Sequence, residues 1–147
     1  MNARRAERSD ASEVVRLVSG LLLELGGRAL DPDVAGRVFG ELLARPELGF
    51  VVLGEVDGAA RAVCTVSFVH ALRSNGRYAI VQEMFVEPAL RSSGLGRRVL
   101  DHATALAREH GCPFVELGTP YDGRRQIEFY RRAGFVSVGE RLRLTLR

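Results

Sequence analysis

The stretch VEPALRSSGLGRRVL, residues 86–100, decides the fold expected of this chain. A hydrophobic run typical of a β-strand ends at Val86, and a proline turn follows it. A short loop with Gly94 and Gly96 then leads directly into an amphipathic helical pattern. Three arginines flank these glycines, Arg91, Arg97 and Arg98. The sequence therefore places a glycine-rich, positively charged loop between the end of a strand and the start of a helix.

This arrangement suits an anionic ligand such as a phosphate or a diphosphate. Glycines let the backbone approach a ligand closely, and the first N–H groups of a helix have no intrahelical partner. The helix dipole adds a partial positive charge at the same end, and the arginines would add full charges. A strand-to-helix turn with a purely structural role contains the same residue types, so the loop alone leaves both interpretations open.

The composition is that of an ordered globular protein. The 147 residues are enough for one domain with a hydrophobic core. The hydrophobic fraction of 46% and the charged fraction of 27% are ordinary for such a domain. The net charge of +3 fits an anionic ligand but is too small to indicate nucleic acid. Because the arginines are scattered and no aromatic-basic platform accompanies them, we expect no nucleic-acid partner.

The cysteines and the N-terminal segment exclude several further classes. Cys64 and Cys112 lie far apart and outside any CxxC pattern, which argues against a disulfide scaffold or a zinc site. We predict no bound metal. The start MNARRAERSD is charged, and the apolar stretch after it contains Arg16 and Glu24, unlike a signal peptide or a membrane span. We therefore expect a cytoplasmic protein without a membrane partner.

The first third of the chain predicts one short strand and two helices. The strand is expected at residues 4–7. Asp10 then opens a helix, with Glu13 as its partner in a capping box, and a glycine pair ends it. A second helix is expected to begin at Asp31, a capping residue that a proline follows at the first helical position. It should end before the proline at position 46.

The rest of the chain predicts a meander followed by alternating helices and strands. Three strands, residues 50–56, 60–72 and 78–86, are separated by the turn sequences DG and SNG and should form an antiparallel meander. A helix at residues 95–110 and a strand at 114–117 follow, and a right-handed crossover would make this strand parallel to 78–86. A last helix at 124–133 precedes an alternating tail, which is expected to end the fold as a strand from Phe135 onward.

Two motifs connect this pattern with a known family. The loop lacks the lysine of GxxxxGK[ST], and it does not complete GxGxxG. It does match R-x-x-G-x-G, from Arg91 to Gly96, after a strand that ends in MFVEP. This loop resembles the acetyl-CoA loop of the GNAT superfamily of N-acetyltransferases. A second motif, IEFYRRAGF at residues 127–135, is similar to the closing helix of that superfamily, and the order of expected elements matches along nearly the whole chain.

The resemblance implies a single N-acetyltransferase domain over residues 1–147. Its fold class is α/β (α+β), with a mixed, mostly antiparallel sheet that is splayed between its central strands and flanked by helices. Acetyl-CoA would be the co-substrate. Its pantetheine arm would pair with backbone groups of Met84, Phe85 and Val86. N–H groups of the loop would hold its pyrophosphate, and the residues concerned are Arg91, Ser92, Ser93, Gly94, Leu95, Gly96 and Arg97.

Two positions depart from the family pattern. Ser92 stands where a glycine is commoner, and a negative φ would let serine take this place. Gly123 stands near the start of the last helix, where many relatives carry an asparagine that touches the CoA arm.

Acetyl transfer to an amine needs a base for the ammonium, donors for the developing oxyanion and a proton for the departing thiolate. Glu83 is the predicted base, because the resemblance places the thioester near the strand AIVQEMFV. Alternation puts Glu83 on the same face as Val81 and Phe85. A hydrogen bond to the backbone, or positioning of a cationic acceptor, is the other role open to Glu83. Tyr130 matches the tyrosine that faces the CoA sulfur in many family members and is the predicted acid, a packed aromatic being the alternative.

The expected activity is that of an acetyl-CoA-dependent N-acetyltransferase, an acyltransferase. The acceptor is expected to be the primary amine of a small molecule, which attacks the thioester directly. A protein or peptide N-acetyltransferase and a non-catalytic acyl-CoA-binding module are the alternatives. A homodimer is compatible with the habit of the family.

Overall fold

The computed structural model describes residues 1–120 and 122–147. The chain divides into two compact units, Met1–Glu116 and Leu117–Arg147. The helices of the first unit are α1 (Ala11–Glu24), α2 (Pro32–Ala44) and α3 (Leu95–Glu109), and the second unit contains α4 (Arg124–Arg132). The expectation that the whole chain forms one domain stays a prediction.

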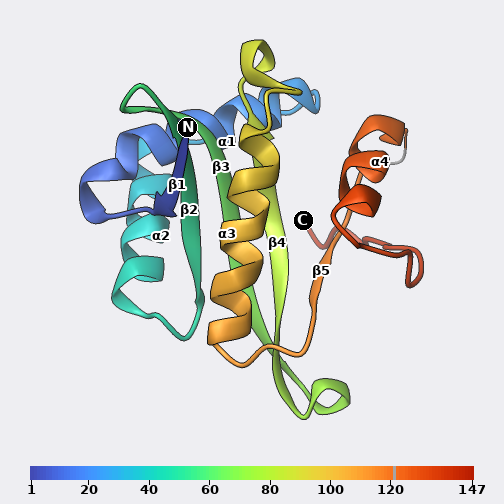
Figure 1. Ribbon diagram of the computed structural model, residues 1–147. Coiled ribbons are helices and arrows are strands. Elements are labelled where there is room, and N and C mark those ends of the chain that lie inside the picture. The colour runs from blue at the N-terminus through green and yellow to red at the C-terminus, as the bar shows by residue number, and fades with distance from the viewer. Residues whose placement is uncertain (121) are drawn as a thin grey trace. The chain divides into compact units, whose positions relative to one another are not determined.

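The strands form one open, mostly antiparallel sheet in the order β1-β2-β3-β4-β5 (Figure 1). Their bounds are β1 Asn2–Arg5, β2 Gly49–Val56, β3 Ala59–Ala71, β4 Gly76–Val86 and β5 Val115–Leu117. Neighbours from β1 to β4 are antiparallel, and β4 and β5 are parallel. The N–H of Ala79, near the start of β4, donates to the carbonyl of Phe114 at 3.2 Å. The predicted fold class is confirmed.

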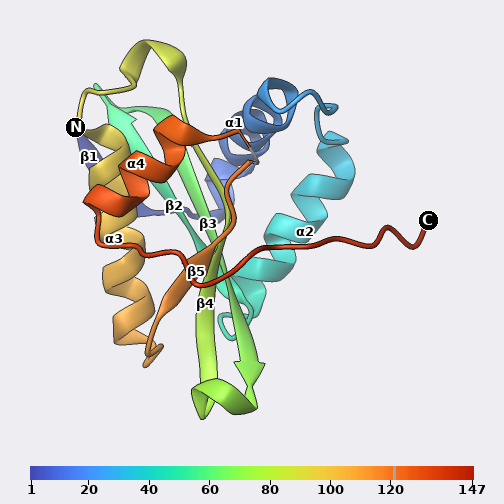
Figure 2. The same ribbon diagram turned by 90° about the vertical axis from the view of Figure 1, so that its right-hand side faces the viewer.

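Helices cover both faces of this sheet. Figure 2 shows α1 and α2 on one face and α3 on the other. The α1–α2 side is an apolar cluster that includes Leu17, Leu53 and Phe85, all buried. On the opposite face, Leu95 and Val99 of α3 are fully buried. The sheet therefore lies between two apolar layers, which explains why β2 reads as an almost continuous hydrophobic run.

The packing of α3 on β2 is unusually close at Gly54. A Cβ atom added there would lie 2.5 Å from Cγ2 of Val99 and 3.0 Å from Cδ1 of Leu95. Because real Cβ atoms do not approach other carbons to 2.5 Å, only glycine fits between the sheet and the first turns of α3. The position of the helix start relative to the sheet depends on this missing side chain.

Of the two predicted helix caps, that of α2 is confirmed and that of α1 is wrong. Asp31 accepts hydrogen bonds from the N–H groups of Asp33 and Val34, at 2.9 and 3.1 Å, and so caps α2 as expected. The capping box of Asp10 and Glu13 is wrong. The carboxylate of Asp10 instead takes two hydrogen bonds from the guanidinium of Arg4, at 2.7 and 2.9 Å, because a paired charged donor is the stronger partner.

The predicted last strand is also wrong. Residues 135–147 belong to no helix or strand. Their apolar side chains Leu142, Leu144 and Leu146 are 88%, 83% and 89% exposed. Alternation sets which side chains share a face, but a strand also needs a partner for its backbone N–H and C=O groups.

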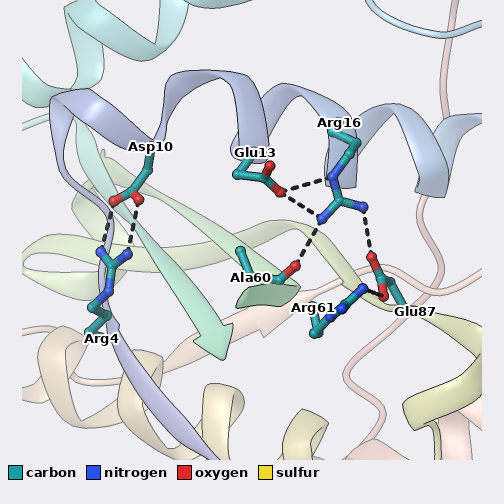
Figure 3. Close-up of polar contacts among 7 residues, drawn as sticks. All are labelled: Arg4, Asp10, Glu13, Arg16, Ala60, Arg61 and Glu87. Carbon is teal, nitrogen blue, oxygen red and sulfur yellow. Dashed lines mark hydrogen bonds and ion pairs between the residues drawn. The ribbon is translucent and has the colours of Figure 1, made fainter. Parts of the chain in front are cut away.

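An ion-pair network joins α1 to the end of β4 (Figure 3). Arg16 donates to Glu13 at 2.7 Å, to the carbonyl of Ala60 at 2.8 Å and to Glu87 at 2.7 Å. Arg61 donates to the other oxygen of Glu87 at 3.1 Å. Burial alone would raise the pKa of Glu87, but these hydrogen bonds hold it below its usual value, so this carboxyl stays ionised at neutral pH. The network fixes the chain directly before the loop.

Candidate active site

The loop after β4 has the backbone shape of an anion-binding turn. A short 3₁₀ helix, η3 (Pro88–Leu90), follows the strand, and α3 begins at Leu95. Ser92 has a φ of +64° and Gly94 has a φ of +93°. The condition of a negative φ at Ser92 is therefore not met, and serine occupies a left-handed conformation that costs about 1 kcal/mol or more. Turns of this kind bring successive N–H groups to one side, where an anion can bind them.

The start of α3 is open to a ligand. Gly94 is the N-cap and brings no side chain to the first turn. The first N–H groups of a helix have no intrahelical partner, and here that of Leu95 donates to Oγ of Ser93 at 3.3 Å. A Cβ added to Gly94 would meet no atom within 4 Å, so open space adjoins the backbone at this point. The N–H groups, the helix dipole and this space together fit a diphosphate such as that of acetyl-CoA.

The arginine side chains of the loop make protein contacts of their own. Arg91 pairs with Glu24 at the end of α1 at 2.6 Å, and its Nε donates to the carbonyl of Val86 at 3.0 Å. Its guanidinium also lies 5.6 Å from the centre of the Phe85 ring. Arg97 pairs with Asp101 at 2.8 Å. The side chain of Arg91 therefore links the loop, the end of β4 and the end of α1.

Glu83 lies half-buried on β4, directly opposite Thr65 of β3. The strand register shifts here: Thr65 pairs with Glu83, whereas the next residue, Val66, pairs with Val81. Gln82 is thus an extra residue, a β-bulge. Glu83 shares a face with Phe85, as expected, but the bulge moves Val81 to the opposite face, so this part of the prediction is wrong.

The carboxylate of Glu83 has a partner that the sequence did not suggest. The hydroxyl of Thr65 donates to Oε2 of Glu83 and accepts a hydrogen bond from the N–H of Glu83 at 3.0 Å. Thr65 is 8% exposed and is the buried polar side chain of β3. The available signal was a hydroxyl within the apolar run AVCTV, but the pairing with Glu83 requires the register across the two strands.

Neither cysteine is suited to act as a nucleophile. Cys64 pairs with Met84 in the strand register and is fully buried. Burial, and then the negative charge of Glu83, raise the pKa of its thiol to about 12. Burial also raises the pKa of Cys112, which is half-buried. A thiol that stays protonated near pH 7 attacks a thioester poorly, because the thiolate is the nucleophile.

Tyr130 lies on α4, in the second unit. It is half-buried, and its ring centre lies 5.1 Å from that of Phe129 and 5.7 Å from that of Phe135. The first unit brings together Glu83, the strand end Met84 to Val86 and the loop up to Arg97. Tyr130 belongs to the second unit, and its role as the acid stays a prediction.

The described part of the chain contains no cluster of three or more His, Cys, Asp or Glu side chains able to hold a metal ion. In residues 1–120 and 122–147, no helix combines the length and the apolar character that crossing a membrane requires.

An open sheet with a glycine-rich loop at the start of the following helix is an arrangement found in acetyl-CoA-dependent acetyltransferases. The family model described as acetyltransferase (GNAT) family matches residues 21–135, and the chain belongs to this family.

Relatives and a solved structure agree with this assignment. An IAA acetyltransferase from Azospirillum brasilense is 31% identical over 141 residues, which cover 93% of this chain and 84% of that protein. A glucosamine 6-phosphate N-acetyltransferase from Trypanosoma brucei brucei is 26% identical over 93 residues, 63% of this chain and 59% of that protein. A predicted acetyltransferase from Clostridium acetobutylicum, solved with acetyl-CoA, has a TM-score of 0.82 and 25% identity and covers 99% of this chain and 96% of its own.

An uncharacterized N-acetyltransferase of Methanocaldococcus jannaschii is 32% identical over 96 residues. The match covers 64% of this chain and 42% of that protein, so the chain spans less than half the length of this relative.

Proposed function

We propose that the chain transfers an acetyl group from acetyl-CoA to the primary amine of a small molecule. The observation that carries the proposal is the half-buried carboxylate of Glu83, on the same strand whose end leads into the diphosphate-binding loop. A carboxylate at that place can accept a proton from an ammonium group, and only the resulting neutral amine has the lone pair that attacks a thioester. The names of two relatives, an IAA acetyltransferase and a glucosamine 6-phosphate N-acetyltransferase, support a small acceptor.

In this proposal each predicted site residue has a role. Backbone groups of Met84, Phe85 and Val86 pair with the pantetheine arm of acetyl-CoA. N–H groups of the loop from Arg91 to Arg97 hold the pyrophosphate, other than those of Arg91 and Ser93, which already donate to the carbonyls of Pro88 and Leu90 at 3.3 Å. Acetyl-CoA supplies the activated acetyl group. Glu83 accepts the proton of the amine, and the hydroxyl of Tyr130 donates a proton to the departing thiolate. A cytoplasmic location, a possible homodimer and the absence of a nucleic-acid partner stay predictions.

The test is thiol release from acetyl-CoA with a panel of amines: spermidine, kanamycin, glucosamine 6-phosphate and a lysine-containing peptide. We expect turnover with one of the small amines. Glu83→Gln should then lower kcat on the order of 100- to 10,000-fold, and Tyr130→Phe at least about tenfold, as is usual for lost proton transfer. Glu109→Gln, at the exposed end of α3, is the matched control and should keep the wild-type rate.

The outcomes separate the alternatives. Calorimetry should give the same acetyl-CoA affinity for wild type, Glu83→Gln and Tyr130→Phe. Turnover with the peptide alone would indicate a peptide acetyltransferase. Tight acetyl-CoA binding without turnover of any amine would indicate a non-catalytic binding module and overturn the proposal.

A further inference from the structure

Thr65 is placed to control the carboxylate of Glu83. The two residues are directly opposite each other in the register of β3 and β4, and Thr65 is buried. Its Oγ1 donates to Oε2 of Glu83 and accepts from the N–H of the same residue at 3.0 Å. One side chain thus contacts both the backbone and the carboxylate of the predicted base.

The donors and acceptors of a hydroxyl group determine which atom donates in this contact. A threonine hydroxyl has one proton and two lone pairs. The N–H of Glu83 occupies one lone pair, and because an ionised carboxylate can only accept, the hydroxyl proton goes to Oε2. Among residues 1–120 and 122–147, no donor makes a hydrogen bond to the second oxygen, Oε1. Thr65 therefore holds the carboxylate through Oε2, and Oε1 can accept a proton.

The bulge at Gln82 makes the pairing possible. Without the extra residue, regular alternation would continue from Val81, and Glu83 would lie on the same face of the sheet as Val81. Bulges commonly redirect a side chain next to an active site. Here the bulge directs Glu83 toward the face that carries Thr65, Val63 and Phe85, the face covered by α1.

We propose that Thr65 is a positioning residue for acetyl transfer, holding Oε2 of Glu83 so that Oε1 takes the proton of the acceptor amine. The inference rests on the proposed role of Glu83 as the base. In this step the N–H bond of the ammonium breaks, its electron pair stays on nitrogen, and the proton forms a bond to Oε1. Thr65 exchanges no proton and touches neither substrate. It fixes where the accepting oxygen lies.

The experiment compares Thr65→Val, Thr65→Ser and the double variant Thr65→Val/Glu83→Gln, with the best amine of the panel. Valine has nearly the volume of threonine but no hydroxyl, and serine keeps the hydroxyl. We expect Thr65→Val to lower kcat at least about tenfold, as loss of a positioning contact does, with an unchanged KM for acetyl-CoA. Thr65→Ser should stay within about threefold of wild type. Ser67→Ala, which removes a hydroxyl from the same strand opposite Ile80, is the matched control and should keep the wild-type kcat.

The double variant tests whether Thr65 acts through Glu83. If it does, adding Thr65→Val to Glu83→Gln costs much less than the tenfold that it costs in the wild type, because the two changes remove one function. An independent role in folding would lower kcat of both backgrounds by the same factor and overturn the inference. Equal losses in Thr65→Val and Thr65→Ser would also overturn it, since packing and not the hydroxyl would then matter.

The failure of this inference differs from the failure of the proposed function. A normal rate in Glu83→Gln would remove the base and the inference with it. A large loss in Glu83→Gln beside a normal rate in Thr65→Val would overturn the inference alone. Thermal unfolding checks that each variant is folded, and Thr65→Ala takes the place of Thr65→Val in every comparison if valine prevents folding.

Discussion

The two units of the chain differ in how far their apolar side chains are buried. Every buried hydrophobic side chain among the described residues belongs to Met1–Glu116. In Leu117–Arg147 the aromatic rings of Phe129, Tyr130 and Phe135 contact one another, but the leucines of the tail are more than 80% exposed. The sequence pattern of the tail is as regular as that of any strand in the first unit. Periodicity thus identifies a face, and burial shows whether that face has a partner.

The largest effect is expected from a matched pair of leucine truncations. Leu53→Ala removes a side chain with 0% exposure from the core of the first unit and should lower the free energy of unfolding by about 3 kcal/mol or more. Leu144→Ala removes one that is 83% exposed and should cost less than about 0.5 kcal/mol. Urea denaturation measures both. A large loss in Leu144→Ala would show that the tail has a buried partner in solution and would remove the contrast.

A second comparison uses the two ends of α3. Gly94 and Gly111 both have positive φ, +93° and +80°, and a Cβ on either would meet no atom within 4 Å. Gly94→Val should weaken acetyl-CoA binding about 100-fold, because the new side chain fills the space where the diphosphate approaches the N–H groups.

Gly111→Val carries the same backbone strain at the far end of the helix and is the control. Its acetyl-CoA affinity, measured by calorimetry, should equal that of the wild type. Equal affinities in both variants would count against the placement of the diphosphate at the start of α3.

The smallest effect concerns one ion pair in each unit. Hydrogen bonds from Arg4 hold the pKa of Asp10 below its ordinary value, so the ionised carboxyl stabilises the fold at neutral pH. Asp10→Asn should cost about 1 kcal/mol at pH 7. This difference should disappear as the pH falls below about 4 and through the lowered pKa of Asp10, where the wild-type carboxyl is protonated as well.

Glu128→Gln is the counterpart in the second unit. It breaks the exposed pair of Glu128 with Arg132, whose N···O distance is 3.4 Å, and should change stability by less than about 0.5 kcal/mol. Denaturation at a series of pH values from 7 downward measures both variants. An Asp10→Asn difference that stays constant through the whole series, without narrowing below about pH 4, would mean that shape, and not charge, is responsible.

Most helices and strands of the first unit could be predicted because local chemistry fixes them. Asp31 followed by proline starts α2, and the turn sequences between β2, β3 and β4 define the meander. The loop and Glu83 could also be located, since glycines and charges stand out against apolar neighbours. Their roles in binding and catalysis stay predictions.

The remaining details depend on contacts between distant segments. The bulge at Gln82 exists only relative to β3, so alternation along β4 alone placed Val81 on the wrong face and gave no reason to select Thr65. The positive φ of Ser92 arises from the path between η3 and α3 and not from its residue type. Asp10 was assigned to the wrong partner because Arg4 reaches it from a separate strand.

The close contact at Gly54 limits how this enzyme can vary. A methyl group at that position would have to displace Val99 and Leu95, and Leu95 is the first residue of the helix whose N–H groups are proposed to bind the diphosphate. A mutation on the buried side of the sheet would thereby alter coenzyme affinity without touching the coenzyme. Among natural or laboratory variants, a loss of binding that maps to β2 would trace back to a displaced helix start.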